Sequence, residues 1–345
     1  MGEVAEAAGS SRRAGPQLKP VLVMGVYRGG RLLAEALESL RPCARAFEKI
    51  VISVNNSDPV ADVSTATGIL DPSNRIILTT GQNLSPVNHH IWLVDRLREK
   101  FASGQVITLL CHDDLVRSEA ILALASKGGW GLRADEVVLG DYEVFGENPL
   151  EPRLLNEKGF ASCFLGSIRD REDVGRMEWF RNLAVISHGF TNVSGMMVPL
   201  RILISTARFL RATRGTKGCR MEYMLVSHRS VKTIRRFRNP IVSIRLHKAQ
   251  ESAAMSSLDL LSDEIRYCLW LYINARTPAD WIYQLQGPQG LANLYRLLRK
   301  WADERSPRSP SLALLVRCFC FPFKVIYLMA RIIDLAIRST GYHPN

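Results

Sequence analysis

The sequence predicts an α/β fold with a mostly parallel sheet flanked by helices, followed by a C-terminal helical extension. Short, wholly apolar runs recur along residues 20–110, which is typical of strands buried on both faces. Stretches with apolar residues at helical spacing separate these runs. Polar clusters follow the apolar runs, where parallel sheets bind ligands.

The first half of the chain alternates strands and helices. Val21–Val26 is an apolar run that ends at Tyr27-Arg28-Gly29-Gly30, and residues 31–40 follow with helical spacing. Ser118 is placed to cap a helix that ends at Ser126. The expected strands are 21–26, 50–54, 76–78, 106–110, 137–139 and 241–244, and the expected helices are 31–40, 87–101, 119–126 and most of 258–298.

Composition divides the chain into six expected segments. The first residues lack the apolar core of a signal peptide, and Ser306-Pro307-Arg308-Ser309-Pro310 reads as a linker. The segments are a disordered tail at 1–19, two halves of the α/β domain at 20–145 and 146–252, a helical extension at 253–305, a linker at 306–311 and an amphipathic helix at 312–338.

The overall composition excludes several classes of protein. Hydrophobic residues make up 47% and charged residues 23%, which excludes a disordered or collagen-like chain. The seven cysteines are scattered without CxxC pairs, so structural zinc is not expected and a reduced, cytoplasmic compartment fits. The sequence shows no conventional transmembrane span.

The positive charge is concentrated in one window. The net charge is +12, and residues 201–248 hold thirteen cations and one carboxylate, Glu222, so the rest of the chain is neutral. Such a window fits a nucleoside diphosphate, an anionic lipid, nucleic acid or a solvated basic face. The only interleaved aromatics are Phe209, Tyr223 and Phe237, so we do not expect specific nucleic-acid binding.

The segment 312–338 predicts an amphipathic helix. Its cations recur every seven residues and share a stripe about 60° wide on a helix, while the rest of the surface is apolar. This pattern favours an anionic membrane surface. The alternative is a helix packed on the protein or in a dimer, because Asp334 interrupts the apolar surface. The cations are Arg317, Lys324, Arg331 and Arg338.

Asp113 and Asp114 directly follow an apolar strand. Two carboxylates there can bind a hard divalent cation, Mg²⁺ or Mn²⁺. The same pair is also common as a helix cap, so both interpretations stay open at this point.

The order of several motifs resembles the family 2 glycosyltransferases with the GT-A fold. The resemblance covers about residues 21–252 and rests on the succession of motifs more than on any single one. The motifs are Val21–Gly30, Val54–Ser57, Asn83 with Asn88, His112–Asp114, Asp135–Glu143, Phe190–Met197, Met221–Leu225, and Arg245–His247 with Ser252.

The resemblance implies a GT-A-like domain that transfers a sugar with inversion from a nucleoside-diphosphate sugar. It makes 20–145 the donor half and 146–252 the acceptor and base half. The implied donor-binding residues are Tyr27, Arg28, Asn55, Asn56, Asn88, His112, Asp113, Arg235, Arg236, Arg238 and Arg245. The implied metal ligands are Asp113, Asp114 and His247, and the acceptor residues are Asn192, Ser194 and Gly195.

Glu222 is the expected catalytic base. It is the only carboxylate in the basic window, so it stays ionised near neutral pH and can take the proton of an acceptor hydroxyl. The alternative is a structural ion pair with Arg220 or another neighbouring cation. The expected acceptor is a saccharide or lipid-linked saccharide, which suits polysaccharide biosynthesis by a hexosyl- or deoxyhexosyltransferase on the inner face of the cell membrane.

The sequence departs from the family pattern at three places. Asn55 and Asn56 stand where the family reads the base with Asp, Cys111 replaces the first Asp of DxD, and Met221 replaces an acid before the base. An inactive relative, a nucleotidyltransferase, and a nonenzymatic binder that uses the 201–248 window therefore stay as alternatives. The oligomeric state is open.

Overall fold

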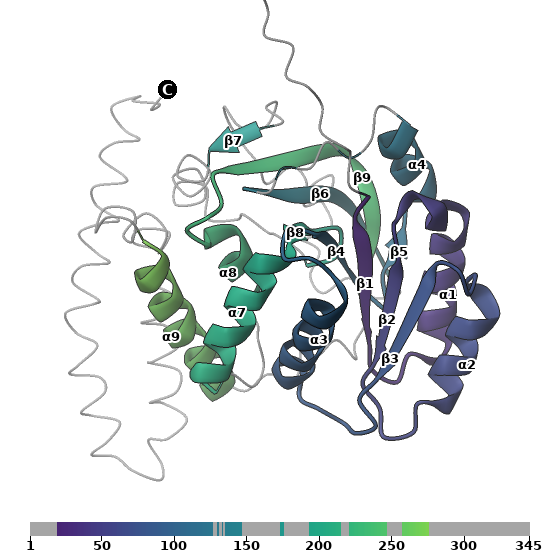
Figure 1. Cartoon of the computed structure of the whole chain (residues 1–345), viewed down its shortest axis with the longest axis horizontal. Helices are drawn as coiled ribbons and strands as arrows, with labels where there is room; N and C mark the ends of the chain where they lie inside the picture. Colours follow the sequence, from purple (N-terminus) through teal and green to yellow (C-terminus); the bar gives the residue numbers. More distant parts are fainter. Residues whose placement is uncertain are drawn as a thin grey trace, which may run out of the picture.

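The computed structural model describes residues 19–126, 130, 133, 135–146, 173–175, 193–214, 221–246 and 257–275 (Figure 1). The expected linker at 306–311 and amphipathic helix at 312–338 lie outside these residues, as does the expected tail up to residue 18. In the described part of the chain, no helix has the length and apolar character that crossing a bilayer requires.

The described strands form one nine-stranded sheet with the order β3-β2-β1-β4-β8-β6-β9-β5, with β7 paired to β9. The strands are β1 Val21–Val26, β2 Ile50–Val54, β3 Arg75–Thr79, β4 Val106–Cys111, β5 Leu115–Val116, β6 Glu136–Gly146, β7 Asp173–Gly175, β8 Met197–Pro199 and β9 Thr233–Leu246. The helices are α1 Gly30–Leu40, η1 Arg41–Ala46, α2 Val60–Ile69, α3 Pro86–Lys100, α4 Ser118–Ser126, α7 Leu200–Ala212, α8 Met221–Ser227 and α9 Ser257–Asn274.

The long ladders of the sheet are parallel, which confirms the predicted α/β class. β1 pairs in parallel with β2 and β4, β2 with β3, and β6 with β9, whereas the antiparallel ladders of β5, β7 and β8 are short. The β6–β9 ladder shifts register between Gly140 and Tyr142. A side chain at Gly140 would lie 2.3 Å from Ile241, so the close approach of these strands requires glycine there.

Helices cover both faces of the sheet (Figure 1). Successive residues of β1 point to opposite faces: Val21 and Val23 contribute to the core cluster that includes α3, α7, α8 and α9, while Leu22 and Met24 join the cluster that includes α1, α2 and α4. Both faces of β1 are therefore buried, as its continuous apolar sequence predicts.

The chain order places a topological switch point between β1 and β4. The next strand after β1, β2, lies on one side of this pair, and the next strand after β4, β5, lies on the other side, so the chain leaves the carboxyl ends of these neighbouring strands in opposite directions. Open α/β sheets bind ligands at such a point. The segments after Val26 and after Cys111 are therefore the candidate ligand-binding segments of the sheet.

Candidate active site at the carboxyl ends of β1 and β4

The turn Cys111–Asp114 lies at this switch point. Cys111 is the last residue of β4 and pairs with Gly25 of β1. One ligand atom from each of Cys111, Asp113 and Asp114 lies within 4.8 Å of the others. The two carboxylates at this spacing fit a divalent cation, because their oxygen ligands suit Mg²⁺ or Mn²⁺, whereas the thiol does not.

Asp114 joins three segments of the chain. It is only 3% exposed. Its Oδ2 accepts a hydrogen bond of 2.5 Å from the Ser194 hydroxyl, and its Oδ1 accepts one of 2.9 Å from the backbone N–H of Arg245. Burial, and then the charge of Asp113, raise the pKa of Asp114 to about 7. Asp114 therefore holds the turn in place, and any metal ligation would use its remaining lone pairs.

Ser194 has a structural role instead of the acceptor contact that we predicted. Its hydroxyl donates to Asp114 and accepts a 2.9 Å bond from the N–H of Cys111, and the residue is 1% exposed. The next residue, Gly195, has a φ of +84° and donates to the Leu109 carbonyl. Both residues therefore support the turn from within the fold. A residue this deeply buried has no exposed surface that could contact an acceptor.

Arg245 also braces the turn, and its contact with the donor phosphates stays a prediction. Its Nε donates to the carbonyl of Asp113 at 3.0 Å, and its guanidinium is paired with the carboxylate of Glu35 on α1. The guanidinium also lies 4.7 Å from the ring centroid of Phe145. With 15% of the side chain exposed, these protein contacts occupy most of the group.

Glu222 lies near the same turn. It is the second residue of α8 and is partly exposed. Its charge contributes, after burial and the charges of Asp114 and Asp113, to raising the pKa of the Cys111 thiol. The charges of Asp113, Asp114 and Glu222 thus act on the same thiol, and the role of Glu222 as base stays a prediction.

The end of β1 supplies accessible side chains at the same edge of the sheet. Tyr27 is 45% exposed, and the guanidinium of Arg28 lies 5.3 Å from its ring centroid. Arg28 has a φ of +49°, and a side chain at Gly29 would lie 2.6 Å from Leu33 Cβ, so the turn packs tightly against α1. This pair is placed to contact an aromatic or anionic ligand.

The predicted asparagines lie in different environments. Asn55 is buried, and its amide exchanges two hydrogen bonds of 2.8 Å with the backbone of Leu84, so it fixes a loop and is not presented to a nucleotide base. Asn56 accepts from the N–H of Asp58 and is partly exposed. Asn88 is exposed in the first turn of α3.

Arg235 lies in an ion pair instead of a phosphate site. Its Nε is 2.8 Å from Oε1 of the buried Glu136, and it also donates to the carbonyl of Trp130. The side chains of Arg236 and Arg238, and the whole of Asn192 and His247, lie outside the described residues. His112 is described and partly exposed within the turn.

Carboxylates from other parts of the chain balance much of the basic window. Besides Arg235 and Arg245, Arg211 lies 2.5 Å from Asp95, and Lys232 lies 3.3 Å from Asp135. These pairs combine basic residues that are clustered in sequence with acids that are distant in sequence. These four cations of the described part of the window are therefore partly neutralised by carboxylates.

The structure adds Cys111 and Glu35 to the residues that the sequence predicts for the candidate site. The position of Cys111 in the motif was visible in the sequence, but we did not predict it as part of the ligand cluster. Glu35 gave no sequence signal, because its partner Arg245 is 210 residues away.

No family model and no curated protein matches this sequence. The chain is similar to a solved structure of residues 1–349 of TarS from S. aureus, with 11% identity over 95% of this chain and 93% of that chain and a TM-score of 0.44. It is also similar to a longer TarS structure, with 11% identity over 84% and 44% of the two chains and a TM-score of 0.46. The mannosyltransferase PcManGT from Pyrobaculum calidifontis, solved with GDP-Man and Mn²⁺, has 11% identity over 93% and 88% and a TM-score of 0.43. At these TM-scores the similarities support no assignment of function.

Proposed function

We propose that this protein is an inverting glycosyltransferase that moves a sugar from a nucleoside-diphosphate sugar to a saccharide or lipid-linked saccharide acceptor. One observation carries the proposal: the carboxylates of Asp113 and Asp114 lie together at the switch point of the sheet. Metal ligands and a base at the ligand-binding edge of an α/β sheet are what this transfer needs. The family 2 motif order in the sequence agrees with it.

Each residue has a proposed part in the reaction. Glu222 accepts the proton of the acceptor hydroxyl as that oxygen forms a bond to the anomeric carbon. Attack from the face opposite the departing diphosphate breaks the bond to the donor oxygen and inverts the configuration. Tyr27 and Arg28 are the exposed groups that hold the donor, through ring stacking and a charged hydrogen bond to phosphate.

Asp113 and Asp114, with Cys111 beside them, are the residues that would hold a divalent cation. Such a cation supplies positive charge that stabilises the leaving diphosphate. Arg245 and Ser194 keep the two carboxylates in place. The role of His247 as a metal ligand stays a prediction. The identity of the transferred sugar as a hexose or deoxyhexose, and the cytoplasmic, membrane-peripheral location, also stay predictions.

The nonenzymatic alternatives have less support in the structure. A binder of nucleic acid or lipid through residues 201–248 needs available cations, but four of the described cations there pair with acids. A nucleotidyltransferase needs a glycine-rich phosphate loop after the first strand. The glycine at position 29 instead packs against Leu33.

Thermal unfolding of the purified chain with nucleoside diphosphates and nucleotide sugars, with and without Mn²⁺, tests the proposal. We expect one nucleotide to raise the Tm in a metal-dependent way. Asp113→Ala should abolish that shift, whereas Glu99→Ala on the exposed end of α3 should keep it. The stabilising donor is then incubated with candidate saccharides and the product examined for anomeric configuration. No shift with any nucleotide would contradict a donor site.

A further inference from the structure

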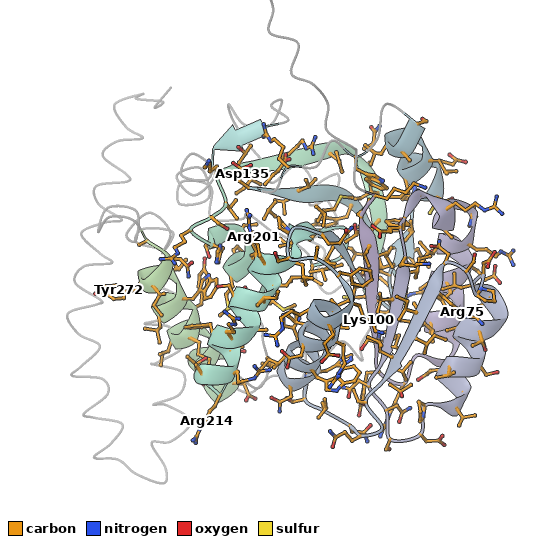
Figure 2. All side chains as sticks on the ribbon, in the orientation of Figure 1. Arg75, Lys100, Asp135, Arg201, Arg214 and Tyr272 are labelled. Carbon is orange, nitrogen blue, oxygen red and sulfur yellow. The ribbon has the colours of Figure 1, made fainter. Side chains whose placement is uncertain are left out.

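The turn between β1 and α1 has an uncommon backbone conformation. Among the described residues, Arg28 and Arg214 are the non-glycine residues with a positive φ, +49° and +50°. Arg214 comes just after α7, where a left-handed residue commonly ends a helix, and it lies at the opposite side of the fold from α1 (Figure 2). Arg28 precedes a helix instead, so the end of a helix does not explain its conformation.

Two contacts hold this turn in place. A side chain at Gly29 would lie 2.6 Å from Leu33 Cβ and 2.9 Å from Val26 Cγ1, so the backbone packs tightly there. The N–H of Gly30, whose φ is +48°, donates to Oδ1 of Asp62 on α2 at 3.2 Å. Uncommon backbone conformations persist where the surrounding structure holds them, and they cluster at functional sites.

Asp62 is a buried acid that gives its hydrogen bond to a different helix. The residue is 4% exposed, and its Oδ2 has no hydrogen-bond partner among the described residues. Burying a carboxyl group with so few hydrogen bonds costs stability. Packing alone therefore does not favour an acid at this position of α2.

The start of α1 explains why an acid is useful there. This helix has no side-chain cap at Gly29 and no acid in its first turn. Asp62 supplies the missing acceptor from α2, and its carboxyl oxygens lie at the positive end of the helix. The next turn of α1 carries Glu35, which pairs with Arg245. Asp62 thus fixes the start of the helix that also braces the Cys111–Asp114 turn.

We propose that Asp62 is a positioning residue for donor binding, because it holds the turn in the conformation in which Arg28 contacts the donor diphosphate. This inference rests on the proposed function, in which Tyr27 and Arg28 hold the donor. Arg28 is two residues from the N–H that Asp62 accepts. Without this bond the turn relaxes, and Arg28 has to be ordered again each time the donor binds, which weakens binding.

A double-mutant cycle tests whether Asp62 acts through Arg28. Isothermal titration calorimetry with ADP, CDP, GDP and UDP, each with Mn²⁺, first identifies the nucleotide that the wild type binds. Asp62→Ala should weaken its binding about 10-fold, and Arg28→Ala at least as much. The double variant should bind no more weakly than Arg28→Ala alone. Additive losses, or an unchanged affinity in Asp62→Ala, would overturn the proposal.

Two further variants separate positioning from a general loss of stability. Asp62→Asn keeps an oxygen that accepts the Gly30 N–H, so it should restore most of the affinity that Asp62→Ala loses. Leu70→Ala truncates a side chain at the other end of α2 that is also 4% exposed, so it destabilises the same part of the fold. This control should bind the nucleotide like the wild type. An Asn variant as weak as the Ala variant, or an equal loss in Leu70→Ala, contradicts positioning by Asp62.

Hydrogen exchange of the free protein tests the hold on the turn without any nucleotide. A peptide that covers residues 27–33 should exchange severalfold faster in Asp62→Ala than in the wild type, while a peptide that covers β4 should exchange at the same rate. Equal rates at 27–33 would overturn the inference alone. A wild type that binds none of the four nucleotides would contradict the proposed function, and a role of Asp62 in donor binding with it.

Discussion

The guanidinium of Arg245, near the end of β9, is paired with the carboxylate of Glu35 on α1, 210 residues earlier in the chain. The same side chain donates to the carbonyl of Asp113, and its backbone N–H donates to Asp114. One residue therefore connects α1, the turn after β4 and β9. This arrangement makes Arg245 a positioning residue for the two carboxylates.

Glu35→Gln should loosen this connection without touching a predicted ligand. Because Glu35 is 36% exposed, solvent screens part of the loss, and we expect the free energy of unfolding to fall by about 1–2 kcal/mol. The affinity for Mn²⁺ with a nucleoside diphosphate should fall severalfold by isothermal titration calorimetry, since the turn loses its brace.

Glu38→Gln is the control for that change. Glu38 lies one turn along the same helix and pairs with Arg41 at the surface, with both side chains about half exposed. Its unfolding free energy should change by less than about 0.5 kcal/mol. If both variants bind the nucleotide like the wild type, Arg245 does not depend on Glu35 to hold the turn.

Ser194→Ala tests the other support of Asp114. The substitution removes the donor to Oδ2 and the acceptor of the Cys111 N–H, both buried. Leaving these groups unpaired should cost about 1–3 kcal/mol of unfolding free energy in urea denaturation. Ser126→Ala, at an exposed hydroxyl at the end of α4, should cost less than about 0.5 kcal/mol. Equal losses of unfolding free energy in the two variants would contradict a specific role of Ser194 in supporting Asp114.

The sequence predicts the N-terminal half of the sheet well because each strand there is apolar on both faces. The expected limits of β1 and β2 are the observed ones. β6 and β9 run much further than the expected 137–139 and 241–244. Their extra residues include glycine, aspartate, asparagine and proline, which oppose strand formation locally. In the sheet, Arg235 is neutralised by Glu136 on the adjacent strand, a pairing that no local pattern reveals.

The dependence on contacts between distant residues also explains which residues of the candidate site could be predicted from the sequence. The sequence identified Asp113, Asp114 and Glu222 because residue type and position after a strand or in a charged window are local properties. Helix α2 at Val60–Ile69 was not predicted, because its apolar residues show little periodicity. Ser194, Arg245 and Asn55 have the right chemistry for ligands, but the fold uses their donors internally. Which donors the fold uses depends on tertiary contacts.

Glu222→Gln should separate catalysis from donor binding. An amide of the same shape keeps the packing of α8 but cannot take a proton, so we expect kcat to fall about 10²–10⁴-fold. The nucleotide-dependent Tm shift should persist. Asp259→Asn, at an acid on α9 away from the turn, serves as a control and should keep kcat. A Glu222→Gln enzyme with normal kcat would remove this residue from the mechanism.

Two histidines on α3, the buried His89 and the partly exposed His90, predict loss of stability in acid. Burial lowers the pKa of His89 and that of His90 to about 4, and the side chain of His89 is bonded to Ser53 Oγ at 2.7 Å. Each histidine is neutral in the fold but takes up a proton below pH 6.5 when unfolded. The stability they contribute is therefore fully present above pH 6.5 and is lost as the pH falls through about 4.

The change in the pKa of His89 from 6.5 to about 4 corresponds to about 3 kcal/mol. Urea denaturation at intervals between pH 7 and 4.5 should show the unfolding free energy of the wild type falling toward acid. His89→Gln cannot take up a proton, so it should flatten this pH dependence. The variant should also be less stable than the wild type at pH 7, because glutamine fits less well against Ser53. Arg98→Gln, at an exposed position of the same helix that stays charged throughout, should leave the slope unchanged. A His89→Gln slope equal to that of the wild type would mean that this histidine is not held neutral by burial.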